Sequence, residues 1–135
     1  MVKKKNNPET WLDRKLLLGG YVAFVTSQTE FEQALVDIKV TDKPDYVPNG
    51  WPACTHSFEL SSGELACIVA LDLEKAAQED PIAVAALLVH EAVHVWQQNE
   101  SKAGKLGCFG DEGEAYAIQN ISTNLMVEYS RRVYG

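Results

Sequence analysis

The chain has 135 residues, of which 46% are hydrophobic and 23% charged, and this predicts one compact globular domain over residues 1–135. A formal net charge of −7 argues against nucleic acid and against an anionic membrane surface as partners, because both require a basic face. The three cysteines, Cys54, Cys67 and Cys108, are odd in number and irregularly spaced. We therefore expect reduced thiols in a cytoplasmic protein and no disulfide framework.

The N-terminal third of the chain predicts a helix, a strand and a second helix. Residues 8–18 can form a short helix that begins at a proline, which suits the first helical turn. A β-branched and aromatic run at residues 21–26 predicts a strand. Residues 28–38 predict a helix that follows a capping-box pattern and carries one apolar stripe. Residues 41–52, rich in proline, predict a loop.

The rest of the chain predicts a hairpin and two long helices. Residues 54–60 and 64–73 read as strands joined by a tight turn, and the second is so apolar that we expect it to be buried on both faces. An Asp-Pro pair opens a helix over residues 81–100, and a last helix covers about 112–132. This order of elements predicts an α+β domain with a small mixed or antiparallel sheet.

The first of these long helices contains the segment His90-Glu91-Ala92-Val93-His94. His90 and His94 are four residues apart, so they lie on one face of a helix, one turn apart, where both imidazoles can reach one zinc ion. Glu91 is unsuited to bind the same ion, but its carboxylate can reach a water at the open coordination position. The spacing therefore predicts a site for one zinc ion with Glu91 as general base.

The alternative for this segment is a pair of ordinary core histidines that arose by chance. The motif is surrounded by apolar residues, so we expect His90, Glu91 and His94 to be buried in an apolar wall. Burying three such groups is costly unless something pairs with them. A metal ion provides that pairing, and this favours zinc over the core histidines.

A catalytic zinc ion requires a third protein ligand. Glu112 and Glu114 open the final helix, and the intervening residues 99–110 are long enough for the chain to reverse and bring this helix back across the motif. The two side chains point in nearly opposite directions on a helix, so we expect only one of them to face the ion. The alternative is that both are acidic residues favoured by the helix macrodipole.

Together, residues 90–94 and 112–116 resemble the zincin metallopeptidases of the glutamate-ligand branch, the gluzincins. In that family the third ligand is a Glu on the following helix, in the pattern Glu-x-x-small-polar. The resemblance implies that Glu112 is the third ligand and leaves Glu114 as the alternative. Tyr116 stands where many members carry an acidic residue or Asn that orients a ligand histidine.

The resemblance also implies a minimal zincin-like α+β domain, in which the sheet packs on the motif helix and the following helix carries the third ligand. In that family an edge strand along the cleft binds substrate in extended form, and one of the two hairpin strands would do so here. Residues 90–97 and 112–119 further resemble small metallopeptidases encoded by bacteriophages and prophages. That likeness implies the host cytoplasm or the virion as location, and virion or assembly proteins as partners.

The sequence thus predicts a zinc-dependent metallopeptidase that acts on a peptide or protein. Glu91 would take a proton from the attacking water and pass it to the leaving amine. The alternatives are a phage structural or assembly protein that keeps the zinc site without turnover, and a metal-free binding module. His56 could stabilise developing negative charge or be a ligand, and Tyr116 and Tyr129 could donate to a tetrahedral intermediate, although sheet, rim or core positions are the commoner roles of such residues.

Overall fold

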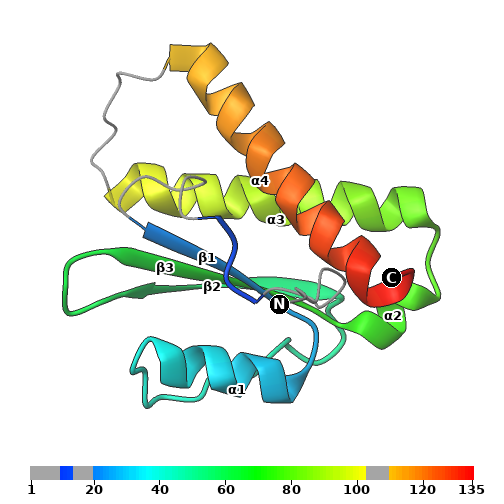
Figure 1. Ribbon diagram of the computed structural model, residues 1–135, viewed down its shortest axis with the longest axis horizontal. Coiled ribbons are helices and arrows are strands. Elements are labelled where there is room, and N and C mark those ends of the chain that lie inside the picture. The colour runs from blue at the N-terminus through cyan, green and yellow to red at the C-terminus, as the bar shows by residue number, and fades with distance from the viewer. Residues whose placement is uncertain (1–9, 14–19, 103–109) are drawn as a thin grey trace, which may run out of the picture.

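The computed structural model describes residues 10–13, 20–102 and 110–135, without the side chains of residues 101–112. A three-stranded mixed sheet packs against two long helices on one face and one helix on the other (Figure 1). The predicted α+β class is therefore confirmed. The elements are β1 (Gly20–Val25), α1 (Gln28–Asp37), β2 (Ala53–Glu59), β3 (Leu65–Leu71), α2 (Leu73–Ala77), α3 (Pro81–Lys102) and α4 (Gly110–Val133).

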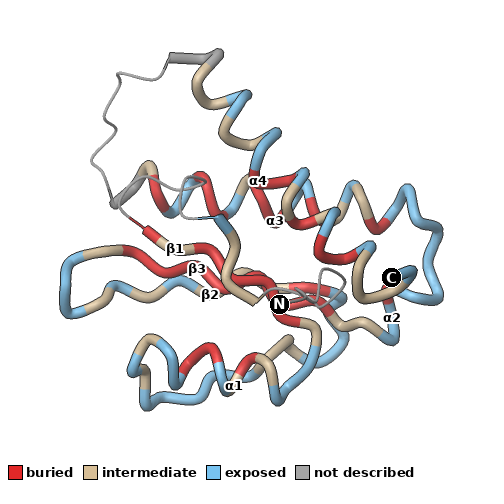
Figure 2. The backbone as a smooth tube through the Cα atoms, viewed as in Figure 1, coloured by how far each residue is buried: buried red, intermediate tan, exposed pale blue. Residues whose placement is uncertain are grey.

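The central strand of the sheet is β3, which pairs in parallel with β1 and antiparallel with β2. All of its residues are buried, as predicted, because helices cover both of its faces (Figure 2). One core lies between the sheet and the α3–α4 layer and includes Leu88 and Leu125. The other core lies between the sheet and α1 and includes Phe31 and Leu35.

Two of the predicted helices, α1 and α3, begin with the caps that the sequence predicts. Ser27 Oγ accepts a hydrogen bond from Glu30 N (3.1 Å), while Glu30 Oε1 accepts one from Thr26 N (2.8 Å). The reciprocal half of the capping box is thus displaced by one residue. At the start of α3, Asp80 Oδ1 accepts a hydrogen bond from Ile82 N at 2.7 Å. In the described part of the chain, no helix, α3 included, has the length and apolar character of a membrane span.

Two predictions of secondary structure differ from the structure. The helix expected at residues 8–18 is wrong at residues 10–13, where Trp11 forms an antiparallel bridge with Ala23; its remaining residues lie outside the described ones. The bridge covers the outer edge of β1. The short helix α2 was missed, because the apolar run of β3 continues into it and its cap, Asp72, was read as part of the strand.

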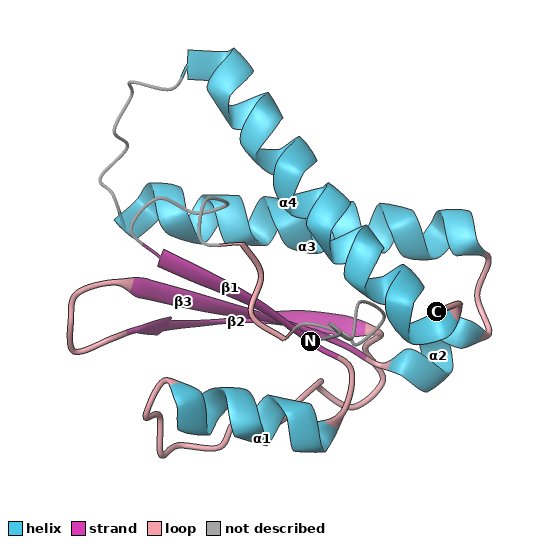
Figure 3. Ribbon diagram, in the orientation of Figure 1, coloured by secondary structure: helices cyan, strands magenta, loops and turns pink. Residues whose placement is uncertain are grey.

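The C-terminal end of α4 is tied to the opposite layer by Arg132, whose side chain is only 4% exposed. Its guanidinium group forms ion pairs with Glu128 on α4 (3.0 Å) and with Glu30 on α1 (3.1 Å). It also lies over the ring of Phe24 on β1, 4.9 Å from the centroid. Figure 3 shows α4 and α1 on opposite faces of the sheet, and the ion pairs of Arg132 connect these two helices.

Glu30 makes the stability of this cluster dependent on pH. Burial raises the pKa of Glu30, but hydrogen bonds from Thr26 and the charge of Arg132 more than offset burial, so the pKa lies below its ordinary value. A carboxylate with a lowered pKa stabilises the fold above its unfolded pKa and loses that contribution as the pH falls through the folded pKa. We expect Glu30→Gln to destabilise the protein at pH 7 and to flatten the loss of stability below about pH 4.5.

Urea unfolding at a series of pH values measures this effect, with the exposed Glu79→Gln as a control that removes one negative charge elsewhere. Identical pH curves for the two variants would contradict the assigned role of Glu30.

Candidate functional site

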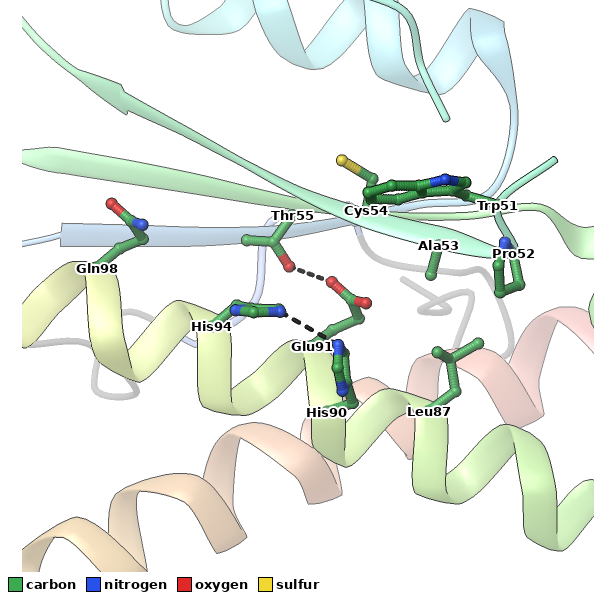
Figure 4. Close-up of a pocket in the computed structure, with 10 residues that line it drawn as sticks. All are labelled: Trp51, Pro52, Ala53, Cys54, Thr55, Leu87, His90, Glu91, His94 and Gln98. Atoms are coloured by element: carbon green, nitrogen blue, oxygen red, sulfur yellow. Dashed lines mark hydrogen bonds between the residues drawn. The ribbon is translucent and has the colours of Figure 1, made fainter. Parts of the chain in front are cut away.

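The motif side of α3 faces β2 across a cleft of about 340 Å³ (Figure 4). The α3 residues that line the cleft recur about once per helical turn. On the other side, the cleft is lined by the first half of β2 and by the loop that precedes β2. The cleft therefore forms where the motif helix passes the edge of the sheet. Its lining residues are Trp51, Pro52, Ala53, Cys54, Thr55, Leu87, His90, Glu91, His94 and Gln98.

The structure brings His90 and His94 together as the spacing predicts. Their Nε2 atoms are 3.2 Å apart, and the ring planes are inclined by 83°. Two nitrogens bound at about 2.0–2.1 Å to one tetrahedral zinc ion lie about 3.3–3.4 Å apart. The observed separation therefore fits two ligands of a single ion, and it also fits a hydrogen bond in which one ring donates to the other.

His94 has a partner that favours the metal-binding tautomer. Its Nδ1 lies 3.3 Å from Oε1 of Gln97, one turn further along the same helix. An amide oxygen can only accept, so this contact is a hydrogen bond when the proton is on Nδ1, and in that neutral tautomer Nε2 carries the lone pair. Gln97 is thus the residue placed to orient the His94 ring, whereas the zincin resemblance implies an orienting residue at the position of Tyr116.

Glu91 is the buried member of the motif, with 4% of its surface exposed. Its Oε1 accepts a hydrogen bond from Thr55 Oγ1 on β2 at 2.5 Å. Within the described part of the chain this is the one hydrogen bond of the carboxylate, and Figure 4 shows the second oxygen pointing away from Thr55. Glu91 is therefore held at one oxygen and available at the other.

The expectation that all three motif residues are buried is wrong for the histidines. His90 and His94 are exposed, because they line the open cleft beside the edge strand β2. Their presence therefore imposes little desolvation cost, and the burial argument for a metal applies only to Glu91. What favours a metal at the histidines is the convergence of their Nε2 atoms.

The described side chains place no third candidate ligand beside His90 and His94. Within those side chains, no group of three His, Cys, Asp or Glu residues could hold a metal ion. Glu114 accepts a hydrogen bond from Trp96 Nε1 at 2.8 Å, and Trp96, two residues after His94, lies on the other side of α3. The backbone of Glu112 is part of α4, and its side chain lies outside the described ones.

The other residues that the sequence singled out lie away from the cleft. His56 is on the α1 face of the sheet, where its Nε2 contacts the carbonyl oxygen of Tyr46 at 2.9 Å and its ring packs on Phe31. Tyr129 is buried in the core next to α3, and Tyr116 is exposed on α4. In the structure these three residues occupy sheet, core and surface positions.

The cleft wall contains residues that sequence reasoning missed. Trp51 is 58% exposed and, with Leu87, forms an apolar wall near His90. Burial and the negative charge of Glu91 raise the pKa of the Cys54 thiol, so this cysteine is protonated at neutral pH. For Thr55 the sequence offers only the alternation of side chains along a strand. This alternation places the Thr55 side chain on one face of β2 but does not identify the residue that it contacts.

Comparisons with known proteins give no relative for this arrangement. No protein-family model, curated protein or solved structure matches the chain. The likeness to zincins therefore rests on the motif, and the chemistry of the site has to be argued from its own residues.

The exposed histidines predict that metal binding and folding are separable. We expect His90→Ala and His94→Ala each to abolish zinc binding, while the metal-free proteins unfold within about 0.5 kcal/mol of the wild type. Isothermal titration with zinc and urea unfolding without it measure the two effects. His56→Ala is a matched control, which should keep zinc binding and lose stability. Retention of near wild-type zinc affinity by either motif variant would show that the site is wrongly assigned.

The third ligand can be tested in the same way. We expect Glu112→Gln to weaken zinc binding by at least about tenfold. Glu114→Gln should change zinc affinity much less, because Glu114 is held by Trp96. The reverse order of affinities would assign the ligand to Glu114, and an unchanged affinity in both variants would exclude α4 as the source.

Proposed function

We propose that this protein is a zinc-dependent metallopeptidase of minimal zincin type, with His90, His94 and Glu112 as metal ligands and Glu91 as general base. The observation that carries the proposal is the pair of Nε2 atoms 3.2 Å apart, in the same cleft as a buried carboxylate with one free oxygen. The described donors, two imidazole nitrogens, are ligands that zinc prefers. When bound, zinc would supply a Lewis acid that polarises a carbonyl and acidifies a water molecule.

Glu91 is placed for proton transfer. Its free oxygen can accept a proton from the water that attacks the peptide carbonyl, and it can return that proton to the amine nitrogen as the C–N bond breaks. Leu88, Ala92 and Val95 of α3 are buried in the core against the sheet, so the carboxylate stays on the cleft side. A purely structural metal site would have no use for such a base.

The edge strand β2 offers a way to hold the substrate. Hydrogen bonds at both ends of the hairpin, from Asp72 N to Pro52 O and from Leu60 N to Glu64 O, fix which residues of β2 face β3. In an antiparallel ladder, residues whose backbone groups bond to the partner strand alternate with residues whose backbone groups point away from it. The backbone N–H and C=O groups of Ala53, Thr55 and Ser57 therefore point away from β3, toward the open edge. In the described part of the chain β2 pairs only with β3. An extended peptide can therefore add to this edge beside the histidines.

The composition of the cleft suggests the side chains it prefers. Trp51 and Leu87 line one end near His90, whereas Gln98 lines the end near His94 (Figure 4). An apolar substrate residue would bury its surface against Trp51 and Leu87, and polar residues would fit the other end. We therefore expect peptides with an apolar residue next to the cleaved bond to be the better substrates.

Glu91→Gln separates catalysis from binding. Gln is nearly isosteric and keeps an oxygen that can accept from Thr55, so packing and zinc affinity should stay close to those of the wild type. It lacks the basic oxygen, so turnover should fall by about 10²–10⁴-fold. Melting temperature, zinc stoichiometry and cleavage of a quenched-fluorescent peptide library are to be measured on the same preparation.

Glu79→Gln serves again as the charge control and should keep full turnover. Unchanged turnover in Glu91→Gln would remove Glu91 from the mechanism. If the wild type binds zinc firmly and cleaves no peptide in the library, the protein is not a peptidase, and a structural or assembly role for the zinc site takes its place.

A further inference from the structure

Two features of the cleft meet at Thr55. Its hydroxyl group donates to Oε1 of Glu91 at 2.5 Å, and its backbone N–H and C=O belong to the outward-pointing set of β2. The side chain thus contacts the general base, while the main chain of the same residue lies on the edge that would bind an extended peptide. No spacing in the sequence connects residue 55 with residue 91.

We propose that Thr55 is a positioning residue that holds the general base and the substrate in register. The inference rests on the proposed peptidase function. The hydroxyl group occupies one oxygen of Glu91 and turns the other toward the cleft. A peptide paired with the backbone of Thr55 would then lie along the residue that holds Glu91, so the bond to be cleaved is expected near Thr55.

The chemistry of the residue suits this role. Threonine is β-branched, which restricts χ1 and fixes the direction of its hydroxyl group on a strand. Glu91 is almost fully buried, and the Thr55 hydroxyl is its one hydrogen-bond donor among the described residues. Without that donor the carboxylate would lose its fixed orientation and turn toward water or toward the histidines. A misplacement of about 1 Å at a reacting group can slow catalysis by about 100-fold.

The test compares Thr55→Val, which removes only the hydroxyl group, with Thr55→Ser, which keeps it. We expect Thr55→Val to lower kcat by about 10- to 100-fold. Its KM should change little, because the backbone edge is intact. Thr55→Ser should restore most of the lost kcat. Zinc stoichiometry should be the same in both variants, because neither change touches the histidines.

A matched control is available in a second Thr–Glu pair far from the cleft. Thr26 Oγ1 donates to Glu30 Oε1 at 2.9 Å. Thr26→Val likewise removes a threonine hydroxyl group that donates a hydrogen bond to a carboxylate. This variant should lower the stability of the protein and leave kcat unchanged. A comparable fall of kcat in this control would mean that Thr55→Val acts through general destabilisation.

Crystal structures of the Thr55 variants provide a readout that does not depend on turnover. The Glu91 carboxylate should leave its position in Thr55→Val and keep it in Thr55→Ser. An unmoved Glu91 in Thr55→Val, or a wild-type kcat, overturns the role of Thr55 and leaves the peptidase proposal standing if Glu91→Gln is inactive. If the wild type itself cleaves no peptide, the proposed function fails, and the role of Thr55 in catalysis fails with it.

Discussion

The constraint on which the rest of the structure depends is the burial of β3 on both faces. A strand without a polar face requires cover from two layers, and α1 on one side and α3 with α4 on the other provide it. With β3 in the centre, β1 and β2 become the two edges of the sheet. Residues 10–12 pair along β1, so β2 is left as the edge that runs beside the motif helix.

The packing of α3 against the sheet gives its two sides different environments, one buried and one exposed. The side facing the sheet supplies core residues such as Leu88 and Val95, and the side beyond the edge of β2 carries the histidines. Glu91 lies at the boundary between them, which is why it is buried and yet lines the cleft. The position of the motif within the helix, more than its composition, gives each of its residues a different environment.

Much of this was predictable because it depends on local rules. The Asp80–Pro81 start of α3, the cap of α1 at Ser27 and the fully apolar run of β3 follow from capping and periodicity. The convergence of His90 and His94 follows from helix geometry alone.

What could not be predicted depends on how elements pack across the chain. The contact between Thr55 and Glu91 requires knowing that β2 is the edge strand beside α3, and helix periodicity did not reveal the exposure of the histidines. The side of α3 on which Trp96 meets Glu114 is likewise set by the core between the two helices. Residues 10–12 were weakly predicted as helical but pair with β1 around the Trp11–Ala23 bridge, because this pairing gives hydrogen-bond partners to backbone groups at the open edge of β1.

The surface location of His90 and His94 has an evolutionary consequence. Core residues are constrained by packing, so substitutions there are removed for their effect on folding. The two histidines carry no such constraint, and a descendant of this chain can exchange them while retaining the same scaffold. Only selection for chemistry would preserve both, whereas position 91, buried against β2, would stay restricted to side chains of similar size and hydrogen bonding even after that chemistry had been lost.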